Sequence, residues 1–180
     1  MHPSLTGAFA RLDRSRAALR AAIDAVPDRL RDRRPGSDRW SVAGIVEHVA
    51  LVDERFITNS AGTIAEARAA GLGQEPGTPA PLPAEVEGIL ANRADRRQAP
   101  EPLHPTGMSW GAAWERAEAS RTIVRALLDG ADVALSLVLL EHQRYGALSA
   151  YQWAGFLAAH ESRHAAQILE TATELGAGEP

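Results

Sequence analysis

The clearest helical signal in the chain lies in residues 149–175, which read SAYQWAGFLAAHESRHAAQILETATEL. Ser149, with Gln152 three residues later, predicts a capping box in which each side chain binds a backbone N–H group of the first helical turn. Apolar residues and two histidines then recur at helical spacing, at Trp153, Leu157, His160, His164 and Ile168. We therefore expect one long amphipathic helix that ends before Gly176 and carries both histidines on its buried face.

Three further segments show the same periodicity. They are residues 3–26, stopped by Pro27; a helix opening at the N-cap Ser41 and ending before Gly71, with a break near 59–62; and residues 109–129, stopped by Gly130. Strand signals are scarce, and the apolar run 135–140, closed by Gly146, is compatible with a buried helical turn. The pattern predicts an all-α fold, an up-down four-helix bundle.

Proline and glycine interrupt the chain between residues 71 and 105, and this density breaks regular elements. A short extra helix is expected within this Pro-rich insertion, from Ala84 to Arg97. The piece is too short to build a core of its own. Residues 1–180 are therefore expected to form a single domain.

Composition narrows the classes of function. The 180 residues carry a net charge of −4, which argues against a nucleic-acid partner. The one basic run, residues 29–39, is interleaved with aspartates and is expected to be a solvated loop. No apolar run is long enough for a membrane span and the start lacks a secretory signal, so a cytoplasmic protein is expected. Without cysteine or lysine, only histidine and carboxylate side chains remain as strong metal ligands.

Two histidines four residues apart suggest a metal site. On a helix, the spacing of His160 and His164 brings their Cβ atoms within about 6 Å, so both rings can converge on one ion. Such a pair also arises by chance in a chain with six histidines. A third ligand is needed.

The other histidines differ in how well they suit that role. His2 is terminal, His104 lies in a loop between prolines, and His142 follows an apolar run near the expected site. His48 borders the buried stripe of the second helix, where a lone histidine is more often a hydrogen-bonded core residue than a ligand. Next to His160 and His164 the ligand interpretation becomes the more favourable one, because a bound metal removes the cost of burying unpaired imidazoles. His48 is the expected third ligand.

Two blocks of the chain resemble the DinB-like four-helix proteins. One is Trp40-Ser41 with His48 seven residues after the serine; the other is YGALS at 145–149, then Trp153, His160, His164 and Gln167-Ile168. The resemblance implies a divalent ion, commonly nickel or zinc, bound by His48, His160 and His164. It also implies a metal-dependent enzyme, since some relatives transfer low-molecular-weight thiols or isomerise thiol adducts, whereas most have no established reaction.

The letters H-E-x-x-H at 160–164 also allow a zinc-protease interpretation, with Glu161 as general base. The extended form of that motif needs a glycine at position 167 and a histidine at position 170, where this chain has Gln167 and Glu170. This interpretation is therefore disfavoured. Glu161 stays a candidate catalytic base, although a residue next to a ligand is turned about 100° away on a helix and is more often solvated or supports the ligands from behind.

Three protein nitrogens leave an open position on zinc or nickel, as expected of a reactive site. An ion with an open position can activate water or a thiol, and the family resemblance alone favours the thiol. The expected function is therefore activation of a thiol or water for transfer to, or hydrolysis of, a small molecule. The alternatives are a non-enzymatic bundle stabilised by its metal and a small-ligand binder with a pocket near Trp40, Tyr145 and Trp153. A homodimer is also expected, since helical bundles often pair through helix faces.

Overall fold

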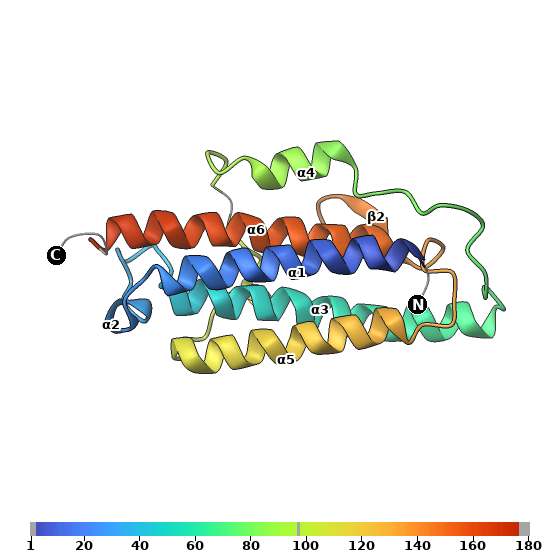
Figure 1. Cartoon of the computed structure of the whole chain (residues 1–180), viewed down its shortest axis with the longest axis horizontal. Coiled ribbons are helices and arrows are strands. Elements are labelled where there is room, and N and C mark those ends of the chain that lie inside the picture. Colours follow the sequence, from blue (N-terminus) through green and yellow to red (C-terminus); the bar gives the residue numbers. More distant parts are fainter. Residues whose placement is uncertain (1–2, 97, 177–180) are drawn as a thin grey trace.

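The computed structural model describes residues 3–96 and 98–176, so His2 and Arg97 lie outside the described residues. Its described part contains four long helices, α1 (Pro3–Asp24), α3 (Val42–Ala69), α5 (Trp110–Asp129) and α6 (Ala150–Glu174). Helix α1 packs mainly against α6, and α3 packs mainly against α5, while α3 and α6 join the two pairs (Figure 1). The predicted all-α bundle is confirmed.

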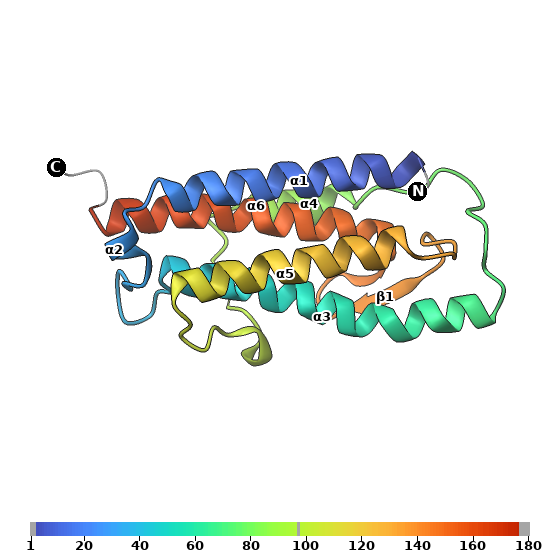
Figure 2. The same cartoon turned by 60° about the horizontal axis from the view of Figure 1, so that its bottom comes forward.

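The directions of the helices correct the expected up-down order at one connection. Figures 1 and 2 show α1 and α6 running one way along the bundle and α3 and α5 running the other way. The chain therefore does not reverse between α3 and α5, because residues 70–109 return it to the end of the bundle at which α3 begins. The resulting order is up, down, down, up.

The insertion lies along α6. Its helix α4 (Ala84–Ala91) packs against α6, and Leu82 just before it is buried against Gly155, where an added Cβ atom would lie 3.2 Å from the Leu82 Cβ. Helix α4 is shorter than predicted, because Asn92 already has extended backbone dihedrals. The 3₁₀ turn η1 (Glu101–Leu103) follows.

A small hairpin precedes α6 where a helical turn seemed compatible with the sequence. Strand β1 (Leu139–His142) pairs in antiparallel fashion with β2 (Gly146–Ser149). Gly146 does not end an element as expected but begins β2, with a φ of 71° that favours glycine. The two strands are too short to produce a readable alternation of apolar and polar residues.

The helix starts follow the sequence closely. Ser41 accepts a hydrogen bond from the backbone N–H of Gly44, and both bonds of the capping box between Ser149 and Gln152 form. The expected break in α3 near residues 59–62 is wrong, since the helix continues to Ala69. None of the described helices is both long and apolar enough to cross a membrane.

The basic run is only partly a solvated loop. It contains the one-turn helix α2 (Asp28–Arg31), in which Arg31 is buried. The Arg31 guanidinium lies 4.3 Å from the ring centre of Trp110, and its Nε donates to the Val26 carbonyl oxygen. The arginine is retained inside because stacking and hydrogen bonds replace water around it.

A layer of polar residues divides the interior of the bundle. One apolar cluster contains Leu5 to Leu12 of α1 and residues 150–158 of α6, and a second contains Leu19 to Val26 and residues 165–172. Between them each long helix contributes buried polar or charged side chains, namely Ser15, His48, Asp53, Ser120, Arg121, Glu161 and His164. The candidate site residues His48, Glu161 and His164 belong to this layer, and His160 is half-buried.

Candidate metal centre

Three histidine side chains meet between α3 and α6. The Nε2 atom of His160 lies 3.3 Å from Nε2 of His48 and 3.1 Å from Nε2 of His164. One ring nitrogen from each of the three lies within 4.8 Å of the other two. His48 and His164 are buried, at 4% and 6% exposure. The structure thus brings together the three residues that the sequence predicted as ligands.

Hydrogen bonds behind two of the rings define their tautomers. His48 donates from Nδ1 to the carbonyl oxygen of Leu103 at 2.8 Å, and His164 donates from Nδ1 to Oε1 of Gln167 at 2.8 Å. A proton on Nδ1 leaves an unprotonated lone pair on Nε2 of each neutral ring. Both Nε2 atoms are therefore ready to act as metal ligands.

The spacing of the nitrogens fits a shared ion. A four-coordinate ion with bonds of about 2.0 to 2.1 Å holds two nitrogen ligands roughly 3.3 Å apart. The two separations that involve Nε2 of His160 are close to this, at 3.1 and 3.3 Å. Without a cation, the single N–H that a neutral His160 could direct at its neighbours would satisfy only one of the two facing lone pairs. The donor set therefore suggests metal binding.

The protonation states are also those of ligands. Burial lowers the pKa of His48 to about 4. Burial, together with the nearby histidines, lowers the pKa of His160 and His164 well below the ordinary value. All three rings are neutral at pH 7, and a metal binds only the neutral form of imidazole.

Glu47 anchors the loop that passes behind His48. This buried carboxylate accepts hydrogen bonds from Oγ1 and the backbone N–H of Thr106, and from the N–H groups of Gly107 and Met108. Burial would raise the pKa of Glu47, but these bonds outweigh it and lower the pKa. The loop held in this way places the carbonyl of Leu103 against the His48 ring.

Glu161 lies apart from the histidine cluster. Its fully buried carboxylate accepts hydrogen bonds from Arg16 Nε at 2.7 Å, from Arg121 Nη1 at 3.1 Å and from Ser15 Oγ. Arg121 also pairs with Asp53, with 3.1 Å between Nε and Oδ2. This network joins all four long helices. It uses the Glu161 carboxylate to hold the bundle together.

A cavity of about 770 Å³ opens above the histidines. Its lining contains Trp40 and His104, whose rings contact each other, and an aromatic wall in which His142, Tyr145, Trp153 and Phe156 contact one another. Phe156 stacks on His160, with ring centres 5.5 Å apart. The three aromatic residues that the sequence suggested as a pocket, Trp40, Tyr145 and Trp153, all line this space.

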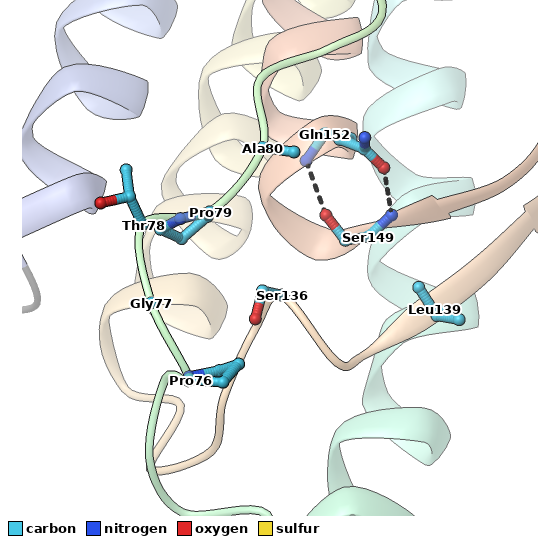
Figure 3. A pocket seen from close by; sticks show the side chains of 9 residues that line it. All are labelled: Pro76, Gly77, Thr78, Pro79, Ala80, Ser136, Leu139, Ser149 and Gln152. Carbon is cyan, nitrogen blue, oxygen red and sulfur yellow. Dashed lines mark hydrogen bonds between the residues drawn. The ribbon is translucent and has the colours of Figure 1, made fainter.

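A second, smaller hollow of about 320 Å³ lies where residues 76–80 pass the start of α6 (Figure 3). The hydrogen-bonded capping pair of Ser149 and Gln152 forms part of its lining. None of its lining residues has a side chain that titrates near neutral pH or binds metals strongly. The larger cavity is therefore the candidate site.

Sequence reasoning missed two supports of the site. The Leu103 carbonyl leaves no trace in a sequence, because any residue could supply it. Glu47 did leave a signal, since it is a carboxylate within the otherwise apolar stretch 42–52 that also contains His48. A charge inside a buried stripe indicates a specific partner.

The fold and the site together define a class, a helical-bundle protein with a candidate metal centre at the floor of an open cavity. Residues 11–168 match the family model of the DinB superfamily, and the chain belongs to this family. No curated protein and no solved structure matches it.

Proposed function

We propose that the protein is a metal-dependent enzyme that activates a thiol or a water molecule for reaction with a small molecule. The observation that carries this proposal is the convergence of three Nε2 atoms on the floor of an open cavity. A purely structural ion is usually enclosed by four protein ligands, whereas three ligands and an open side are typical of reactive sites.

His48, His160 and His164 would hold the ion, and zinc or nickel suits an all-imidazole set. Such an ion lowers the pKa of a bound water or thiol toward neutrality. The protein's own groups prepare the site: Leu103 and Gln167 orient two of the rings. Glu161 has no role in this proposal, because its carboxylate is already bonded to two arginines.

The first test is isothermal titration of zinc and nickel into metal-free protein. Wild-type protein should bind one ion per chain, and His160→Ala should lower the affinity at least tenfold, since one of three ligands is lost. His142→Phe is the matched control, because it removes a cavity imidazole outside the cluster. Equal affinity of wild type and His160→Ala would disprove the metal site.

A second test addresses the reaction. Metal-loaded protein incubated with low-molecular-weight thiols and chlorodinitrobenzene should form a thioether adduct and release chloride, and a chelator should stop the reaction. A parallel assay with activated esters tests hydrolysis. Failure of both assays across several thiols and esters would remove the enzymatic proposal.

Chelation separates the enzyme from a bundle that merely depends on its metal for stability. The apolar clusters on either side of the polar layer are formed largely by side chains of the four long helices, and neither cluster includes His48, His160 or His164. Metal-free protein should therefore keep its helical circular dichroism and a cooperative thermal transition. Unfolding on chelation would instead identify a structural ion.

A further inference from the structure

Arginine side chains gather around the candidate cavity. Six line it, namely Arg39, Arg55, Arg93, Arg96, Arg144 and Arg163, against two carboxylates, Asp38 and Glu141. The chain as a whole carries a net charge of −4. Positive charge is therefore concentrated where a small molecule would enter.

Several of these arginines have structural partners. Arg93 makes a two-pronged pair with Glu170, Arg39 pairs with Glu174, and Arg163 donates to backbone carbonyls of the insertion. Arg55, Arg96 and Arg144 form no ion pair with a carboxylate in residues 3–96 and 98–176, but the charge of Arg96 acts on the Glu170 carboxylate, which leaves Arg55 and Arg144. Arg55 is moreover half-buried. A half-buried guanidinium without a counter-charge is costly, and a bound anion would remove that cost.

Arg55 lies on the same face of α3 as His48. The two are seven residues apart, which corresponds to two helical turns and roughly 10 Å along the axis. Val52 lies between them, and all three residues line the cavity. Arg144 lies in the turn of the hairpin and lines the same cavity. Burial lowers the pKa of His142, and the positive charges of Arg55 and Arg144 lower it further.

The surface between the arginines and the histidines is aromatic. His142 contacts Phe156 with ring centres 4.7 Å apart, and Phe156 in turn stacks on His160. Trp153 contacts both His142 and Phe156. A flat apolar body would fit this wall, with one end at the arginines and the other at the histidines.

We propose that the cavity binds a small molecule with a flat apolar body and an oxyanion group, a carboxylate or a phosphate, held by Arg55 and Arg144. Guanidinium groups match both oxyanions through paired N–H donors. The placement of the reacting end at the histidines rests on the proposed function. The anion end does not, because it depends on the two arginines alone.

Titration calorimetry with three probes tests this inference on the full-length protein. Benzoate and phenyl phosphate should each bind at least tenfold more tightly than benzamide, a neutral analogue of benzoate. The tighter of the two anions identifies the oxyanion. Equal affinity for benzamide and both anions would overturn the proposal. The preference for the anions over benzamide should persist after the metal is removed with a chelator. If the preference disappears, the anion binds at the histidine end and the proposal is overturned.

Substitutions assign the preference to residues. Arg55→Met and Arg144→Met should each lower anion affinity about tenfold and leave benzamide affinity unchanged, while Arg55→Lys should retain part of the affinity. Arg14→Met is the matched control, because Arg14 is exposed on α1 and does not line the cavity. Unchanged anion affinity in both methionine variants would disprove the assignment.

Zinc titration of the same variants separates the two proposals. Unchanged zinc affinity in a variant shows that its histidine site is intact. If Arg55→Met misfolds and loses zinc binding, the Arg144→Met variant decides the outcome, because Arg144 is exposed. An anion preference in wild-type protein that binds no zinc would leave this inference standing and remove the proposed function. Zinc binding without any anion preference would do the reverse.

Discussion

His48 and Leu103 are joined by a hydrogen bond from the imidazole Nδ1 to the main-chain oxygen, 2.8 Å long and spanning 55 residues of sequence. This bond ties the Pro-rich insertion to the histidine cluster. It fixes which nitrogen of His48 carries the proton, so that Nε2 faces the other two rings. The insertion is therefore part of the site, as well as the connection between α3 and α5.

Glu47→Ala should weaken the site without removing a ligand. The change removes a buried carboxylate that accepts four hydrogen bonds from the loop around Thr106, and we expect a loss of roughly 3 kcal/mol of unfolding free energy. Zinc affinity should also fall, because the loop no longer holds Leu103 against His48. Urea unfolding and zinc titration measure the two effects. Glu66→Ala, an exposed glutamate on the same helix, should change neither.

Gln167→Leu should reduce metal affinity by about tenfold to a hundredfold, the range typical of residues that orient a ligand. The side chain of Gln167 accepts the Nδ1 proton of His164 and so directs its Nε2 toward the cluster. Competition with a fluorescent zinc chelator gives the affinity. Gln143→Leu provides a control, since Gln143 is exposed at the cavity but bonds to none of the three histidines. Equal affinities in the two variants would contradict the orienting role.

Arg121→Met should destabilise the bundle by about 3 kcal/mol, because it removes the more deeply buried of the two arginines that bridge Asp53 and Glu161 and leaves Arg16 as their only cation among the described residues. Arg125→Met, one turn later on α5, should cost no more than about 1 kcal/mol, since its pair with Asp13 is exposed. Urea unfolding compares the two. Similar losses would show that the buried network contributes no more than a surface ion pair.

Glu161→Gln tests the same network from its acidic side. We expect lower stability in the urea assay and unchanged zinc affinity, because Glu161 bonds to Ser15, Arg16 and Arg121. A large loss of turnover with stability unchanged would instead support a direct catalytic role for this residue.

Metal-free protein should lose stability as the pH falls from about 6.5 to about 4. Burial lowers the pKa of His48 from 6.5 to about 4 in the folded state, so the unfolded chain binds more protons in this interval. Since one pKa unit corresponds to about 1.4 kcal/mol, His48 alone accounts for roughly 3 kcal/mol of this loss. His160 and His164 act in the same direction.

Urea unfolding of chelated protein at several pH values measures this dependence. Burial raises the pKa of Asp53, and this shift increases stability as the pH falls, opposite to the effect of the histidines. The pH dependence of wild-type protein is therefore compared with that of a variant. His48→Leu should show a weaker loss between pH 6.5 and 4 than wild type. Identical pH profiles for the two proteins would rule out a buried neutral His48.

The helices and the pairing of His160 with His164 could be predicted because their signals are local. Capping at Ser149 and apolar spacing through Ile168 depend on neighbours within a few residues. The hairpin at residues 139–149 and the early end of α4 at Ala91 could not be predicted as readily, since short elements are stabilised by packing on α6 rather than by their own pattern.

The amino-acid order by itself therefore determined a bundle of four amphipathic helices and two histidines on one buried helix face. Only the tertiary structure decided that His48 points its Nε2 at that pair and that Glu161 turns instead to Arg16 and Arg121. It also decided that Arg55 lines the cavity with no carboxylate partner in the part of the chain that the structure describes. The reason is physical: helical periodicity acts over one or two turns, whereas these contacts join segments of the chain that meet only when the helices pack.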